Sequence, residues 1–337
     1  MKPNVLITGA SGFIGSHLIE ESITQGYNVF AAVRPSSKIN FPNNTDVTVI
    51  YLDYQDKEAL TNQLVLLKEQ YGRFDYIIHN AGTTRANTVE EFNIVNNLLP
   101  QQFIQALQAA SNIPDKFLLI SSMASFGPGD TKTMQPITVH QSKQPISQYG
   151  QSKKAISEFL QQQSIVPYTI VYPTAVYGPR DKDFIELVKL INKGYEPYLG
   201  LYKQILSMVH VQDLAFAVVS LLKKAANKSE YIVSDTYNYN KKDLGSIIKK
   251  ILGKKTLKFS IPVTPVLGIA AITEWIYKVI APKKMPLLTR EKINEISCPN
   301  WSCEANDVWD TIGAKPRYNL ETGLEHTVNW YKENGFL

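Results

Sequence analysis

The sequence predicts an α/β protein built on a doubly wound parallel sheet, with a smaller, mainly helical lobe at its C-terminal end. Two observations support this prediction. Apolar, β-prone segments alternate with helix-like segments along the first half of the chain, which is the pattern of a parallel sheet with right-handed crossovers. The first apolar segment also stops at a glycine-rich turn that opens a helix, as the phosphate-binding turns of such sheets do.

The predicted elements follow one another in a regular order. Strands are expected at Asn4–Thr8, Asn28–Val33, Val47–Leu52, Tyr76–Asn80, Lys116–Ser121 and Tyr168–Tyr172. Helices are expected between them, at Phe13–Gln25, Lys57–Gln70, Val89–Ser111 and Gln148–Gln163. Beyond Pro173 helix-like stretches dominate, at Phe184–Lys193, Val211–Ala225 and Lys241–Leu252.

Composition narrows the class of protein. Of the 337 residues, 44% are hydrophobic, which is enough for a sizeable core. The net charge is only +5 and the lysines occur as scattered pairs, so no nucleic-acid partner is expected. Two cysteines are too few for a disulfide framework, and the five histidines lack metal-ligand spacing, so no metal site is expected. The absence of a signal peptide favours a cytoplasmic protein.

The glycine turn predicts a dinucleotide-phosphate site. Three glycines at a spacing of three follow the strand and precede a helix, so the backbone can approach a pyrophosphate and the helix amides can face its charge. The expected cofactor contacts there are Gly9, Ser11, Gly12, Phe13, Ile14 and Gly15. Residues 1–173 are therefore predicted to form a dinucleotide-binding domain, to which about 205–235 return, and residues 174–337 to form most of a substrate-binding lobe.

A second pattern predicts proton-transfer chemistry. Tyr149 and Lys153 are four residues apart, so on a helix they share one face. A phenol with a pKa of about 10 is a poor acid or base at neutral pH, and a neighbouring ammonium lowers that pKa. Ser122 follows a buried strand whose carboxyl end faces the ligand crevice, where its hydroxyl can bind a substrate carbonyl.

Taken together, these motifs resemble the extended short-chain dehydrogenase/reductase family, in the order that the family uses and over nearly the whole chain. The resemblance implies a Rossmann-like domain, a nicotinamide cofactor and hydride transfer. Tyr149 would move the proton, Lys153 would hold the nicotinamide ribose, and Ser122 would orient the carbonyl.

Further segments are similar to other stretches of the family. Asn96 resembles a structural asparagine, whereas Tyr172 stands where the family has arginine and is given no catalytic role. The implied cofactor contacts are Asp53, Tyr54, Asn80, Ala81, Gly82, Pro173 and Val176. The implied substrate contacts are Met123, Ser125 and Tyr177. A homodimer is a further expectation from the family.

The end of the second strand favours NADP(H) over NAD(H), although NAD(H) remains an alternative. NAD-binding domains place a carboxylate there for the ribose 2′-hydroxyl, whereas this chain has Arg34, followed by two serines and Lys38. Arg34 and Lys38 can pair with a 2′-phosphate.

An NADP-type site favours net reduction, because a reductase releases oxidised cofactor in each cycle. The favoured function is therefore an NADP(H)-dependent oxidoreductase acting on a ketone or secondary alcohol. The C-terminal third is similar to the dihydroflavonol reductase and 3-beta-hydroxysteroid dehydrogenase branches and holds only two arginines, Arg290 and Arg317, which favours an apolar small-molecule substrate. Alternatives are an NAD-dependent nucleotide-sugar epimerase and a non-catalytic module that senses the cofactor.

The apolar segment Phe259–Ala281 holds two prolines, Glu274 and Lys278, so it is a poor bilayer span and no integral membrane segment is predicted. A helix from about Val266 to Ile280 is expected instead. Packing against the protein's own body is the favoured interpretation, and the alternatives are an apolar wall or lid for the substrate or a peripheral membrane contact.

Overall fold

The computed structural model describes residues 2–35, 37, 47–280, 286 and 289–337. Its centre is a seven-stranded sheet in the order β10-β6-β5-β4-β1-β2-β3, and every neighbouring pair is parallel. The strands are β1 (Asn4–Thr8), β2 (Asn28–Val33), β3 (Val47–Tyr51), β4 (Tyr76–His79), β5 (Lys116–Ile120), β6 (Tyr168–Pro173) and β10 (Ser229–Val233). The predicted fold class is confirmed, and the six predicted strands end within one residue of their expected positions.

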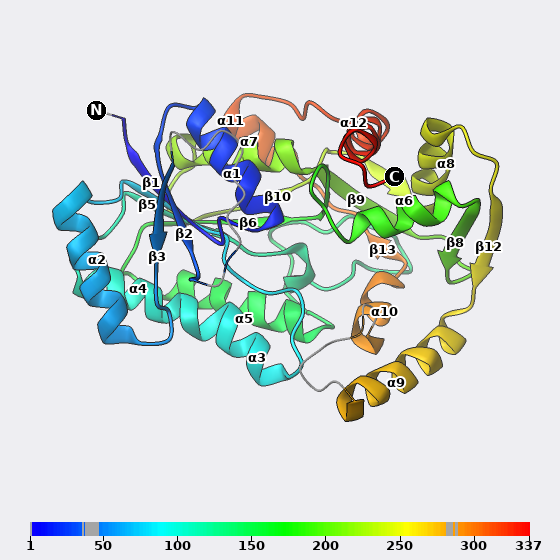
Figure 1. The fold of residues 1–337 in the computed structure, drawn as a ribbon, viewed down its shortest axis with the longest axis horizontal. Helices are drawn as coiled ribbons and strands as arrows, with labels where there is room; N and C mark the ends of the chain where they lie inside the picture. Colours follow the sequence, from blue (N-terminus) through cyan, green and yellow to red (C-terminus); the bar gives the residue numbers. More distant parts are fainter. Residues whose placement is uncertain (1, 36, 38–46, 281–285, 287–288) are drawn as a thin grey trace.

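Helices cover both faces of this sheet (Figure 1). One face carries α1 (Phe13–Thr24), α7 (Val211–Lys224) and α11 (Asn306–Ile312), and the other carries α2 (Lys57–Tyr71), α3 (Val89–Asn93), α4 (Leu99–Ala109) and α5 (Gln148–Gln162). Successive strand residues point to opposite faces of the sheet. Leu6 and Phe30 pack in the core against α2 and α4, whereas Ile7 and Val29 pack in the core against α1 and α7. Burial on both faces explains why these strands are apolar throughout.

A second group of elements forms the C-terminal lobe, which lies beside the carboxyl ends of the parallel strands (Figure 1). A small sheet contains β7 (Ala175–Tyr177), β9 (Ile205–His210), β11 (Asn238–Asn240) and β13 (Asn300–Trp301), and a two-stranded sheet pairs β8 (Tyr195–Leu199) with β12 (Leu257–Ile261). The helices of the lobe are α6 (Phe184–Asn192), α8 (Lys241–Leu252), α9 (Val263–Ile280), α10 (Arg290–Ile296) and α12 (Leu320–Glu333).

The segment 205–235 divides between the two sheets. β10 extends the seven-stranded sheet at β6 and α7 covers that sheet, whereas β9 belongs to the small sheet of the C-terminal lobe. β10 was not among the strands expected from the sequence, because its glutamate and serine obscure the apolar pattern of an edge strand.

The helix expected over Val89–Ser111 is interrupted by a π-helical segment, Ile94–Leu98. Pro100 follows this segment and has no N–H to donate to the preceding turn, which removes one regular helical hydrogen bond. Such π-helical turns occur frequently at functional sites.

Helix α9 contradicts the favoured interpretation of its sequence. It forms where a helix was expected, but Ala270 is its one buried residue, so most of the helix does not pack against the body of the protein. In the described part of the chain, α9 is the one helix whose length and composition would allow it to cross a bilayer. A single helix of this kind is weak evidence for a membrane span.

Candidate active site

The glycine turn lies where the strand order of the sheet reverses, between the carboxyl ends of β1 and β4. Ligands of open α/β sheets bind at this switch point. Gly9 has a φ of +63°, and a Cβ there would lie 2.8 Å from the backbone of Ala81. A Cβ on Gly15 would overlap the Gly9 carbonyl, so α1 can approach the turn this closely only with glycine.

The N-terminus of α1 is open to an anion. Gly12 is the N-cap and offers no side-chain cap, and the first turn holds no acidic residue. The amides of Phe13 and Ile14 therefore point out of the helix end beside the exposed Ser11. An uncapped helix start above a glycine cradle fits the pyrophosphate of a dinucleotide.

The segment after β4 joins this cradle. Asn80 Nδ2 donates to the Gly9 carbonyl at 3.2 Å, and the Ala81 amide donates to Thr8 Oγ1 at 3.0 Å. A Cβ on Gly82 would lie 3.2 Å from Lys153 Nζ. The structure thus brings Asn80, Ala81 and Gly82 between the glycine turn and the lysine.

Asn96 fixes this segment to the helix that carries the lysine. Its side chain accepts from the Thr83 amide at 2.8 Å and donates to the Thr83 carbonyl at 2.9 Å and to Ser152 Oγ at 3.0 Å. The π-helical turn places Asn96 inward, where it is buried. Asn96 therefore acts as a positioning residue for the loop after β4.

Ser122, Tyr149 and Lys153 converge at the carboxyl end of β5. Ser122 follows that strand and caps a short 3-10 turn through the Ala124 amide at 3.2 Å. Tyr149 and Lys153 lie in the first two turns of α5, and the Ser122 hydroxyl is close enough to Tyr149 to lower the pKa of its phenol. The side chains that the sequence grouped as catalytic are thus close neighbours in the fold.

The electrostatics of this group differ from the sequence-based expectation. Burial raises the pKa of Tyr149 to about 12, and the nearby Ser122 hydroxyl opposes this only in part. Burial lowers the pKa of Lys153 to about 8, and its ammonium donates to the Ile120 carbonyl at 2.9 Å. The phenol therefore keeps its proton at neutral pH, which suits a proton donor.

The three expected substrate contacts are all buried. Met123 packs in the core of the sheet, and Ser125 Oγ donates to the Ser122 carbonyl at 2.7 Å. Tyr177 is 1% exposed in the core of the C-terminal lobe, where its hydroxyl donates to the Asn319 carbonyl. Burial favours packing roles for Tyr177 and Met123 over contact with a substrate.

The residues expected at the adenosine end lie together at the edge of the sheet. Arg34 is exposed at the end of β2, and Asp53 is exposed two residues beyond the neighbouring strand β3. Tyr54 differs from these two exposed residues in its burial. Its ring packs against Phe103 and its hydroxyl is buried, so its side chain points into the protein. Lys38 lies outside the described residues.

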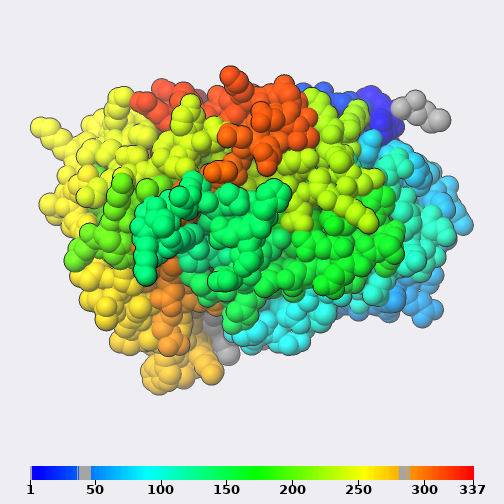
Figure 2. Space-filling model, turned by 180° about the vertical axis from the view of Figure 1, so that it is seen from behind, coloured from blue at the N-terminus to red at the C-terminus, as the bar shows by residue number. Residues whose placement is uncertain are grey.

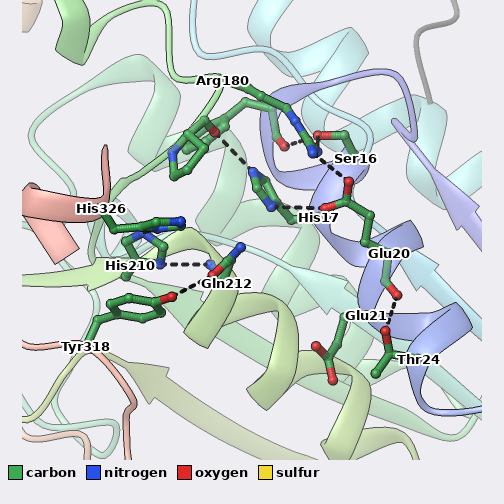
Figure 3. Close-up of polar contacts among 12 residues, drawn as sticks. Ser16, His17, Glu20, Glu21, Thr24, Arg180, His210, Gln212, Tyr318 and His326 are labelled. Atoms are coloured by element: carbon green, nitrogen blue, oxygen red, sulfur yellow. Dashed lines mark hydrogen bonds and ion pairs between the residues drawn. The ribbon is translucent and has the colours of Figure 1, made fainter. Parts of the chain in front are cut away.

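The segment after β6 is held against α1. Pro173 ends β6 and is buried, and Val176 is half-buried in β7. Beyond them, Arg180 donates to Ser16 Oγ at 2.9 Å and pairs with Glu20, both on α1 (Figure 3). The predicted cofactor segment containing Pro173 and Val176 is therefore fixed next to the glycine turn.

A cluster of histidines lies beside this contact (Figure 3). His17 Nε2 contacts the Pro179 carbonyl at 3.0 Å, and His210 Nε2 contacts His326 Nδ1 at 3.2 Å. Burial lowers the pKa of all three, to about 4 for His17 and about 3 for His210. The cluster joins α1 to the C-terminal lobe with neutral rings. The described residues hold no group of three or more side chains suited to a metal.

No motif in the sequence indicated that Glu291 would lie beside the site. The Glu291 carboxylate accepts the backbone N–H of Gln148, so α10 binds the first turn of α5 beside Tyr149. A distance of 143 positions along the chain separates the partners. The neighbouring Arg290 pairs with Glu274 of α9 at 2.8 Å.

The sheet order and the glycine cradle at its switch point define a Rossmann-like dinucleotide-binding enzyme. The chain belongs to the NAD dependent epimerase/dehydratase family, whose model matches residues 5–238. The family binds NAD(H), and its enzymes include dehydrogenases, dehydratases and epimerases.

Curated relatives align over nearly their full length. The chain is 26% identical to a ceramide reductase of Caulobacter vibrioides, over 99% of this chain and 96% of the relative. It is 28% identical to a decarboxylating sterol-4-alpha-carboxylate 3-dehydrogenase of Dictyostelium discoideum, over 96% and 99%. It is also 25% identical to a UDP-glucose 4-epimerase of Vibrio cholerae, over 97% and 95%.

The fold is that of solved structures in the family. A UDP-glucose 4-epimerase from Thermotoga maritima, solved with UDP-glucose, superposes with a TM-score of 0.77 at 19% identity, over 98% of this chain and 99% of that chain.

Proposed function

We propose that this protein is an NADP(H)-dependent oxidoreductase that transfers hydride between the nicotinamide and a ketone or secondary alcohol of a fairly apolar small molecule. The convergence of Ser122, Tyr149 and Lys153 beside the glycine cradle carries this proposal. A protonated phenol, a serine hydroxyl and a buried ammonium around one point are the groups that carbonyl reduction needs.

In the reductive direction, the bound nicotinamide supplies the hydride that the carbonyl carbon accepts. Ser122 donates a hydrogen bond to the carbonyl oxygen and orients it. Tyr149 gives its proton to the same oxygen as the alcohol forms, and its raised pKa keeps that proton available at neutral pH. Lys153 lies against the loop after β4. With the cofactor bound, its ammonium would hold the nicotinamide ribose and would balance the charge of the phenolate that remains.

The arginines of the C-terminal lobe favour an apolar substrate over a nucleotide sugar. Arg317 pairs with the buried Asp213 at 3.1 Å and also binds the Gln212 carbonyl, and Arg290 pairs with Glu274. Both are engaged in structural contacts, so neither is placed to clamp a pyrophosphate. The ceramide and sterol carboxylate in the names of two relatives support the same substrate class.

The first test is an assay of the purified protein for oxidation of NADPH and NADH with ketones of increasing apolarity. Turnover is expected with NADPH and apolar ketones. An epimerase would instead interconvert UDP-sugars without added cofactor, and that result would overturn the proposed reaction in favour of the alternative suggested by the Vibrio relative. Cofactor binding without any turnover would favour a sensing module.

Preference for NADP(H) rests on Arg34. Within the described ranges, the five other arginines each pair with a carboxylate, whereas Arg34 has no such pair and its side chain is exposed at the end of β2. Its guanidinium is therefore available to a phosphate on the adenosine ribose.

An Arg34→Glu variant is expected to weaken NADPH binding at least about tenfold while changing NADH binding much less, because a carboxylate repels the 2′-phosphate. Fluorescence titration of both cofactors measures the two dissociation constants. Arg73→Glu, an exposed arginine at the opposite end of the strands, is the control. Equal weakening of both cofactors by Arg34→Glu would contradict an NADP-specific role.

A further inference from the structure

We propose that the outward face of α9, together with the adjoining end of β12, is a membrane-docking surface that binds an anionic lipid bilayer without crossing it. α9 lies at the edge of the C-terminal lobe, away from the seven-stranded sheet (Figure 1), and from behind this part of the chain protrudes below the body of the molecule (Figure 2).

The first support is the amphipathic pattern of α9, which is the reverse of the pattern found in surface helices of soluble proteins. The side of α9 that faces the protein holds Ala270, Thr273 and Glu274. The exposed side holds a stripe of large apolar residues at helical spacing: Ile269, Ile272, Trp275, Ile276, Val279 and Ile280. A soluble surface helix turns its apolar stripe inward, so a contiguous exposed stripe marks an interaction surface.

The apolar surface continues onto neighbouring elements. β12 leads directly into α9, and Leu257, Phe259 and Ile261 occupy alternate positions on it, so they share one face and all are exposed. The Gly200 amide donates to the Ile261 carbonyl at 2.8 Å, which brings the exposed Leu201 to the same end of β12.

Charge and residue type identify a bilayer as the occupant. Between Gly253 and Ile280 the chain holds four lysines and one carboxylate. The carboxylate, Glu274, pairs with Arg290, and one of the lysines, Lys258, pairs with Glu196. Lys254 and Lys255 are exposed just before β12, and Lys278 is exposed on α9. Trp275 within the stripe and Tyr277 next to Lys278 are exposed aromatic residues that suit the headgroup region. A second copy of the chain would bring the same lysines face to face, so charge disfavours a self-complementary dimer.

The contacts of α9 fit a helix that lies in the membrane plane. The backbone N–H and Nε of Arg290 both bind Glu274, on the inward side of α9, which attaches the helix to the start of α10. A spanning helix would carry that ion pair into hydrocarbon, at a high cost. An in-plane helix keeps Glu274 and Arg290 on the protein side.

The docking surface adjoins the candidate active site. α10 connects the two, because Arg290 binds α9 and Glu291 binds the first turn of α5, next to Tyr149. If the proposed function holds, this arrangement presents the site to apolar substrates that partition into lipid. Membrane binding itself does not depend on the reaction.

Vesicle flotation of the full chain tests the surface. The wild type is expected to float with vesicles of phosphatidylcholine and phosphatidylglycerol and to float less with phosphatidylcholine alone. An Ile272→Glu, Trp275→Glu variant should lose at least about tenfold in vesicle partitioning, because two exposed anchors are replaced by repelled charges. Leu66→Glu on α2 is the matched control, since Leu66 is 63% exposed and Ile272 61%.

A wild type that stays unbound with both vesicle types, or a double variant that floats like the wild type, would overturn the proposal. Light scattering distinguishes a bilayer from a second copy of the chain as the occupant of this surface. If the wild type were a dimer that binds no vesicles, and the double variant were a monomer, the surface would be assigned to a second copy. Circular dichroism checks that both variants fold. Because no substrate is present, failure of the proposed reaction leaves this result unaffected.

Discussion

A Tyr149→Phe variant is expected to lose about 100- to 10,000-fold in kcat for carbonyl reduction, the usual contribution of a positioned general acid. The phenol hydroxyl is the proton donor of the proposed reaction, and its raised pKa keeps it protonated at neutral pH. Phenylalanine keeps the ring that packs against Phe92, with centroids 6.3 Å apart, so the fold and the cofactor site should be preserved.

Two measurements make this prediction specific. Single-turnover rates with NADPH report the chemical step, and fluorescence titration reports cofactor binding, which should be unchanged. Tyr71→Phe, the same substitution at the half-exposed end of α2, should retain full activity. Wild-type turnover by Tyr149→Phe would exclude the phenol as the acid, and a parallel loss of NADPH binding would indicate a structural role instead.

The local parts of this fold could be predicted from the sequence because short-range patterns determine them. Each inner strand is apolar on both faces, and each is bounded by a turn, so its ends could be assigned to within a residue. The glycine turn could be predicted because Gly9 adopts a positive φ, a conformation that glycine reaches without strain. Tyr149 and Lys153 could be paired because helical spacing puts them on one face.

Features that depend on distant contacts could not be predicted. The approach of Glu291 to Gln148 and of Arg180 to Glu20 joins residues more than a hundred positions apart. Composition showed that α9 would be an apolar helix, but whether its apolar side faces the protein depends on what lies beside it. The pKa of Tyr149 likewise depends on burial by several elements, and this outweighs the pairing suggested by spacing alone.

Acid is expected to destabilise the fold steeply below pH 6.5. Burial lowers the pKa of His17 to about 4 and those of His79 and His210 to about 3, from 6.5 in the unfolded chain. Between pH 6.5 and about 4, each takes up a proton only on unfolding, so each lowers the unfolding free energy by about 1.4 kcal/mol per pH unit as the pH falls. Asp235 opposes this, because burial raises its pKa to about 6 and the folded state binds its proton first. For these four groups alone the balance is about two protons, or roughly 3 kcal/mol between pH 6 and pH 5.

Urea unfolding at a series of pH values measures this slope directly. A His17→Gln variant should reduce it by about one proton, because the variant loses one of the groups that protonate on unfolding. His140→Gln, which removes a histidine from an exposed loop position, is the matched control. Because His17 binds the Pro179 carbonyl and so holds α1 against the segment after β7, its protonation in the folded protein should loosen the junction beside the glycine turn. The lowered pKa of His17 places that step near pH 4, so NADPH affinity is expected to fall only as the pH approaches 4. A stability that is flat between pH 6.5 and pH 5 would show that the histidines are protonated within the folded protein and that the junction tolerates their charge.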